Sequence, residues 1–262
     1  MPTPIEILLD PISLFVLAMY GAVIIWEFLF PGRKLPVIPG WKFRALTVFA
    51  MYFYLSSYLP LIWDAHLAQF QLFDLSGLGT MGSVIVGLFI YELVAYWWHR
   101  SMHQSRVLWR GLHQMHHSAE RLDSFGAFWF SPMDMIGWTL FGSLSLVLVV
   151  GVTPQAATVL LLVITFLAIF QHANIHTPRW LGYLIQRPES HTIHHGKGIH
   201  QYNYSDLPVF DMLFRTFQNP HGYEVETGFY TGASERVAEM LLFKDVATSD
   251  KKMKATTDIT VS

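Results

Sequence analysis

Five long apolar stretches alternate with polar segments along the 262-residue chain, at about residues 12–30, 45–63, 80–98, 133–152 and 155–173. Each is near the roughly 20 residues with which a helix, rising about 1.5 Å per residue, crosses a bilayer core of about 30 Å. The pattern predicts an all-α fold, a polytopic membrane helix bundle of about five spans. Buried helices of a large soluble protein are the alternative interpretation.

The composition favours a membrane protein over a soluble one. Hydrophobic residues make up 52% of the chain and charged residues 14%, a balance that is too apolar for an ordinary soluble domain of this length. The first stretch lacks a basic start and a small-residue cleavage signature, so we expect an anchor helix rather than a removed signal peptide.

The positive charges give the bundle a direction, because Lys and Arg accumulate in cytoplasmic loops. If the first stretch starts outside, all 17 Lys and Arg residues lie on the inner side, and the outer turns at 64–79 and 151–154 carry none. Pro154 is suited to begin the last span. The inner segments 99–132 and 174–262 are then expected to meet as one polar cap on the cytoplasmic side.

Charge and cysteine content narrow the possible chemistry. The net charge is −2 and no long basic block occurs, so nothing in the sequence indicates a nucleic-acid partner. The chain has no cysteine, which excludes disulfides, thiolate metal sites and cysteine nucleophiles. A metal ion would therefore be held by nitrogen and oxygen ligands.

Ten of the 13 histidines form four groups with ligand-like spacing. Positions i, i+3 and i+4 share a face of a helix, so each group is expected to aim its imidazoles in one direction. Two HxxxH pairs end apolar stretches that both run inward, and each is followed by an HxxHH group. The chain thus places two sets of five imidazoles in one layer: His99, His103, His113, His116 and His117, then His172, His176, His191, His194 and His195.

So many imidazoles in one layer indicate metal binding. Unpaired, they would repel one another when protonated and lose hydration when neutral. Imidazole suits iron, zinc, copper and nickel alike. Structural zinc is satisfied by four ligands, whereas ten candidates would give two metals about five each and leave room for an exogenous ligand. This favours a di-metal redox site, with iron the first choice for oxygen chemistry.

Several of these segments carry a family resemblance. The stretches "YELVAYWWHRSMH", "HQMHHSAERLD", "FQHANIHTPRWLG" and "HTIHHGKGIHQYNYSDLPVFDMLFRTF" resemble the histidine boxes and tail of the fatty acid hydroxylase superfamily, which includes sterol desaturases. The resemblance spans about residues 80–218. It implies an integral membrane, O2-dependent di-iron enzyme that hydroxylates or desaturates a lipid, with two iron ions (Fe2+/Fe3+) as cofactor.

The resemblance also implies a ligand set and a division of the chain. Nine of the ten histidines match family ligands, whereas His176 fits by spacing and matches a less constant position. Residues 1–79 would be a two-span membrane anchor, 80–220 the catalytic domain and 221–262 a cytoplasmic tail with a disordered end. Phe210 and Arg215 depart from the family pattern in "FDMLFRTF", which leaves the substrate subfamily open.

Four further residues are candidates for supporting roles around the metals. Glu92 lies inside a span, where a carboxylate is costly and therefore indicates a functional role. Glu92 and Tyr96 share a helical face with the first HxxxH pair, and Glu92 would accept an imidazole N–H. A polar contact between helices is the alternative. Asn203 is either a ligand or, preferably, a turn residue, and Asp211 orients a histidine or, preferably, caps a helix. His200 is a possible outer partner.

The implied reaction needs electrons from elsewhere, because the chain has no GxGxxG fingerprint, no haem attachment motif and no thiolate cluster. A cytochrome or ferredoxin-type donor fed by NAD(P)H is the expected partner. The apolar substrate would enter from the bilayer between spans three to five. Two other functions stay open: a metal transporter or metal-binding membrane protein, and a zinc-dependent lipid hydrolase that needs no reductant.

Overall fold

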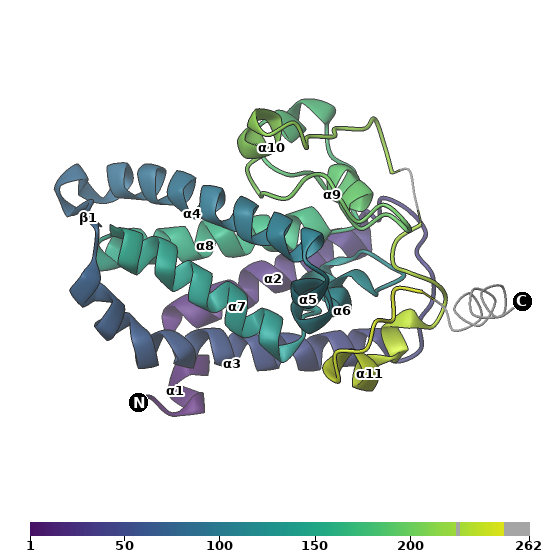
Figure 1. Ribbon diagram of the computed structural model, residues 1–262, viewed down its shortest axis with the longest axis horizontal. Coiled ribbons are helices and arrows are strands. Elements are labelled where there is room, and N and C mark those ends of the chain that lie inside the picture. Colours follow the sequence, from purple (N-terminus) through teal and green to yellow (C-terminus); the bar gives the residue numbers. More distant parts are fainter. Residues whose placement is uncertain (224–225, 249–262) are drawn as a thin grey trace, which may run out of the picture.

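The long helices of the computed structural model lie side by side, and most of the shorter helices gather with loops at one end (Figure 1). The structure describes residues 1–223 and 226–248. Five helical stretches are long and apolar enough to cross a membrane: Pro11–Leu29, Trp41–Phe70, Ser76–Gln104, Pro132–Val149 and Pro154–His172. They match the predicted stretches to within a few residues at most ends, which confirms the all-α bundle of five spans.

The spans are built from helices α2 (Pro11–Leu29), α3 (Trp41–Leu67), α4 (Gly79–Gln104), α7 (Pro132–Ser143) and α8 (Pro154–His172). A short helix, α1 (Pro4–Leu9), precedes them. The 3-10 turns η1 (Ala68–Phe70) and η2 (Ser76–Leu78) extend α3 and precede α4, and the π-helix η5 (Leu144–Val149) continues α7. Helix α4 continues past its apolar run and carries the first HxxxH pair on the same helix.

The starts of α7 and α8 follow directly from the sequence. Ser131 and Thr153 are N-caps whose side chains accept backbone N–H bonds from the third residue of each helix, and a proline occupies the first helical position. Proline lacks the N–H that would be unsatisfied there, and its fixed φ suits the helix. The expected helix start at Pro154 is confirmed.

The two predicted outer turns meet at the end of the bundle remote from the histidines. Strand β1 (Phe73–Asp74) pairs in parallel with β2 (Val150–Gly151), and Figure 1 shows β1 at the opposite end from α5 and α6. Large apolar side chains such as Phe28 and Met81 stay exposed along the bundle, at 78% and 68%. An apolar exterior suits helices surrounded by lipid.

The cap consists of short elements from three parts of the chain. They are α5 (Arg106–Leu108), the π-helix η3 (Trp109–His113), α6 (Gln114–His117), η4 (Ser124–Phe128), η6 (Arg179–Tyr183), α9 (Pro188–His194), α10 (Val209–Leu213), η7 (Ala233–Glu235) and α11 (Val237–Leu241). The segments 99–132 and 174 onward thus meet as predicted.

The predicted tail contributes to the core of this cap. Phe229, Met240 and Val246 are buried in one cluster with Trp41 and Trp129. The indole N–H of Trp41 also donates to Asp123 at 3.0 Å, which fixes the start of α3 to the cap. The disordered end expected from the sequence lies, after residue 248, outside the described residues.

The cytoplasmic position of the cap is a prediction from charge, and topology reporters test it. A compartment-specific reporter inserted after Asp74 should be active outside, and one fused after Ser262 should be active in the cytoplasm. The reverse pattern would invert the orientation. Activity of both reporters on one side would contradict a bundle with five spans.

Candidate metal centre

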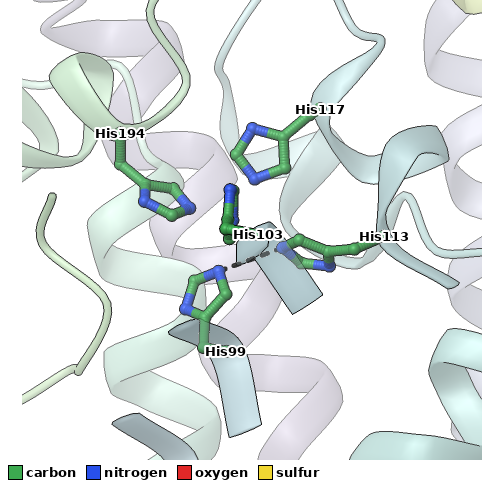
Figure 2. A group of neighbouring side chains, drawn as sticks. All are labelled: His99, His103, His113, His117 and His194. Carbon is green, nitrogen blue, oxygen red and sulfur yellow. Dashed lines mark hydrogen bonds between the residues drawn. The ribbon is translucent and has the colours of Figure 1, made fainter. Parts of the chain in front are cut away.

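Nine imidazoles lie in two adjacent groups at the cap end of the bundle. In each group, one nitrogen from every ring lies within 4.8 Å of the others. Figure 2 shows the first group, whose rings approach one another from α4, which carries His99 and His103, and from the segments that carry His113, His117 and His194. Group one is His99, His103, His113, His117 and His194, and group two is His116, His172, His191 and His195.

The two HxxHH segments each serve both groups, which differs from the expectation that each aims its imidazoles in one direction. His113 and His117 join group one while His116 joins group two, and His191 and His195 join group two while His194 joins group one. Successive helical residues are about 100° apart, so i and i+4 point nearly alike whereas i+3 is turned aside. A short helix between two centres can therefore supply both.

His176 lies outside both groups, so group two has four members instead of the predicted five. One of the four also differs from the prediction, since His116 replaces His194. Helix α8 ends at His172, and Ala173 has an extended backbone with φ −65° and ψ 143°. The helical spacing that would have placed His176 above His172 is therefore absent. The His176 side chain is 70% exposed, and its Nδ1 lies 3.9 Å from Glu189.

A single loop fixes the orientation of three imidazoles in group one. The Nδ1 atoms of His103, His194 and His99 lie 2.7 Å from the backbone carbonyl oxygens of residues 200, 202 and 204, respectively. A carbonyl only accepts, so each Nδ1 carries the hydrogen and each Nε2 of a neutral ring is left with a lone pair. The loop achieves this with left-handed backbone at His200, Tyr202 and Asn203.

Two other ligand candidates are oriented in the same way. His113 Nδ1 lies 2.8 Å from the buried carboxylate of Asp134, the pairing that commonly supports a metal-bound histidine. His172 Nδ1 lies 2.6 Å from the carbonyl of Ala168, one turn earlier in α8. Both rings thus present Nε2 to the centre.

The Nε2 atoms are placed as ligands of a shared cation. His99 Nε2 and His113 Nε2 are 3.0 Å apart, although the partners of their Nδ1 atoms leave both with lone pairs. Two ligand nitrogens at right angles, each about 2.1 Å from one metal ion, lie about 3 Å apart. The Nε2 atoms of His103, His117 and His194 are buried without a hydrogen-bond partner in the described structure. One bound cation would satisfy all five nitrogens.

Group two shows the same spacing with fewer supporting contacts. His172 Nε2 lies 3.1 Å from His116 Nε2 and 3.2 Å from His191 Nε2, which is 3.2 Å from His195 Nε2. The groups touch, since the rings of His117 and His195 stack with centroids 4.2 Å apart. Two metal ions would therefore be neighbours.

The electrostatics also suit metal binding. Burial lowers the pKa of His116, His117, His191, His194 and His195 well below the usual range, and neighbouring imidazoles lower it further. These rings are consequently neutral at pH 7, the form in which an imidazole binds a metal.

Asn203 and Asp211 act on the loop rather than on the centre. The Asn203 amide donates to the carbonyls of Ser190 and Gln218 and accepts from the Gln218 N–H, which agrees with the preferred turn role. Asp211 accepts the backbone N–H groups of Tyr204 and Ser205 at 2.8 and 2.9 Å. Both side chains thereby hold the carbonyls that orient the imidazoles.

The other two candidates and His200 have different partners. Glu92 is fully buried and accepts the backbone N–H groups of Asp206 and Leu207 rather than an imidazole N–H. Tyr96 shares hydrogen bonds with Thr216 and Arg100. His200 Nδ1 lies 3.2 Å from His117 Nδ1, the outer position expected for it.

Two functional contributions were missed from the sequence, and a third, the expected substrate cavity, was located only in part. Asp134 lies in the first turn of α7, and nothing in the sequence indicated that it would face a histidine. The loop carbonyls have no side-chain signal at all. An apolar cavity of about 510 Å³ opens onto both groups, at His99, His113, His116, His172 and His191. It is lined by all five spans, including α2 and α3, rather than by spans three to five alone.

Comparison with known proteins agrees with this architecture. The family model of fatty acid hydroxylases matches residues 84–216, about half of the chain and all nine clustered histidines. The chain belongs to the fatty acid hydroxylase family.

Individual relatives are distant. The chain is 27% identical to sphinganine C4-monooxygenase 1 of Arabidopsis thaliana over 145 residues, 54% of this chain and 55% of that protein. It is 30% identical to the ornithine lipid hydroxylase OlsE of Rhizobium tropici, over 52% of this chain and 42% of that protein. Human alkylglycerol monooxygenase is 27% identical over 69% of this chain and 38% of its own length.

The chain thus spans about half the length, or less, of these curated relatives. No solved structure matches the chain significantly.

Replacement of Asp134 with Asn tests the support of group one. We expect roughly 10- to 100-fold weaker metal retention, because the orienting acceptor of His113 loses its charge. Metal content per protein after dialysis against graded chelator measures this effect. Asp74→Asn, at the exposed far end of the bundle, is the matched control. Equal retention in both variants would show that Asp134 does not support a ligand.

The pair His172→Ala and His176→Ala tests the assignment of α8. The first variant should lose about one metal ion per chain, because it removes one of four nitrogens from group two. The second should retain the wild-type content, since its imidazole is exposed. Metal analysis of the two purified proteins distinguishes them. Metal loss in His176→Ala would return that residue to the ligand set.

Proposed function

We propose that the two histidine groups hold two iron ions and that the protein is an O2-dependent oxidoreductase that hydroxylates or desaturates a membrane lipid. The substrate would be a sterol, a fatty acyl lipid or a related apolar molecule. The observation that carries this proposal is a pair of adjacent, all-imidazole centres that open onto an apolar cavity between membrane-spanning helices. The relatives support it, because their names describe monooxygenases or hydroxylases of lipids.

Bound iron would supply the activation of O2 that an unactivated C–H bond requires, while the protein binds and orients the substrate. In hydroxylation, one oxygen atom enters the C–H bond and the other leaves as water, with two electrons and two protons consumed. The apolar walls exclude water from the reacting carbon. Five nitrogens would hold one ion and four the other.

The electrons would come from a separate cytochrome or ferredoxin-type protein fed by NAD(P)H. The chain has no cysteine for an iron–sulfur cluster and no dinucleotide fingerprint. Such a donor would approach the cap, because the imidazole groups lie at that end of the bundle.

The geometry weighs against the two other functions. A transporter places ionisable ligands near the membrane midplane along a path, whereas both groups here lie at the inner ends of α4 and α8. A zinc hydrolase site usually has three protein ligands and a water. Group one offers five imidazoles, more than that chemistry uses.

Lipid analysis of cells with and without the protein tests the proposed function. We expect an oxidised lipid that depends on the protein, on O2 and on a reductant. The His194→Ala variant should lower its formation more than about 100-fold, because a ligand of group one is lost, while the exposed His221→Ala should leave it unchanged. Turnover of a lipid under anaerobic, donor-free conditions would overturn the oxygenase assignment.

A further inference from the structure

The chain turns back along α4 after the loop that orients the imidazoles. The backbone N–H groups of Asp206 and Leu207 donate to Glu92 at 2.9 and 3.1 Å. Four residues further on, the ring of Phe210 lies 6.3 Å from that of Phe89. Figure 1 shows α10 beside α4, on the flank of the bundle. The segment that begins in the cap therefore continues next to a membrane-spanning helix.

These contacts lie at the depth of the bilayer core. The span Ser76–Gln104 has 29 residues, whereas a hydrocarbon core of about 30 Å covers only about 20 residues of helix. Every placement of such a core within this span includes about residues 85–95. Phe89 and Glu92 both fall in that interval, so their partners at 206–210 lie beside the part of α4 that lipid surrounds.

The backbone of this segment suits such a depth. Non-helical backbone is tolerated in the bilayer core only where its polar groups are bonded within the protein. Two buried carboxylates accept the backbone N–H groups of residues 204–207: Asp211 accepts the first two and Glu92 the last two. The next residue, Pro208, has no N–H to satisfy. The carboxylate of Glu92 within a span thus has a physical reason.

The outward side of α10 is apolar. Val209, Met212 and Leu213 are exposed, Leu213 by 66%, and none of the three is among the residues that line the cavity beside the imidazoles. They therefore face the surroundings of the protein. Three exposed apolar side chains on a helix of five residues are unfavourable in water, whereas contact with lipid removes that cost.

A second element enlarges this apolar side. The backbone N–H of Gln186, just after η6, donates to the carbonyl of Asp206 at 2.7 Å, which joins η6 to the segment before α10. Three large side chains of η6 and the residue that follows it are also exposed, Leu184 by 61%. We call the combined surface the flank surface; its residues are Trp180, Tyr183, Leu184, Val209, Met212 and Leu213.

The contacts along α4 change toward the cap in the order of a membrane interface. Phe89 packs against α10, whereas two turns later Trp97 lies 5.0 Å from the ring of Phe214. The guanidinium of Arg100 then lies 5.5 Å from the Trp97 ring. Tryptophan is enriched at the lipid–water boundary and arginine at the level of the headgroups. The flank surface is thus continuous with the lipid-facing side of α4.

We propose that the flank surface is inserted into the leaflet on the cap side, with the acyl chains of that leaflet as its partner. Residues 204–214 then form a re-entrant element that leaves the cap, enters the bilayer beside α4 and returns. The element is shorter than the roughly 20 residues of a full span, so hydropathy does not reveal it. The same segment carries the carbonyl that orients His99, so the lipid contact would also brace this part of the centre.

Spin labels on the full-length protein in phosphatidylcholine vesicles test this contact without turnover. The chain has no cysteine, so Leu213→Cys and Leu184→Cys each carry a single nitroxide. Power-saturation EPR compares collisions with O2, which concentrates in the bilayer, and with chromium(III) trisoxalate, an inert anion that stays in water. Ile85→Cys, exposed on the same span, is the lipid control, and Lys197→Cys, exposed in the cap, is the water control.

Both flank labels should behave like the lipid control, with chromium collisions at least about tenfold below those at Lys197, because burial of an anion in hydrocarbon is costly. Chromium collisions like those of the water control at either site would overturn the proposal. Low collisions with both reagents would show that protein covers the surface, which would also overturn lipid as its partner. Met212→Cys and Tyr183→Cys repeat the measurement if a leucine variant does not fold.

Discussion

Three backbone carbonyls set the chemical state of the candidate metal centre. The loop 200–204 accepts the Nδ1 hydrogens of His103, His194 and His99, and this leaves their Nε2 lone pairs to face one another. Such an arrangement is unfavourable for a buried cluster unless a cation fills it. The left-handed residues of the loop, and the side chains of Asn203 and Asp211 that hold it, serve this one requirement.

The exchange of His116 and His194 ties the two groups together. Each group needs residues from both halves of the chain. Group one forms only when the end of α4 meets both HxxHH segments, and group two only when the end of α8 meets them. Burial then lowers the pKa of the cap imidazoles His116, His117, His191, His194 and His195 and favours their neutral form. The cap and the bundle consequently depend on each other, because α4 positions two residues of group one, α8 positions one of group two, and the cap supplies the others.

The bundle contributes more than an anchor. Its helices enclose an apolar chamber that leads to the imidazoles, and their outer surfaces are apolar as well. Under the proposed function, a lipid substrate would pass between these two environments without crossing water, and the polar chemistry at one end of the fold would act on molecules that remain in the bilayer. Membership of the fatty acid hydroxylase family supports that proposal.

Hydropathy alone determined the five spans, because a helix that crosses lipid must be apolar over a set length. Charge alone predicts their direction, which the topology reporters test. The spacing of the histidines likewise indicated a metal centre and nine of its candidate residues. The tertiary structure decided the rest: α8 ends before His176, each HxxHH segment divides between two groups, and Glu92 holds a loop instead of an imidazole. These outcomes depend on where helices end and on backbone carbonyls, which no side-chain pattern records.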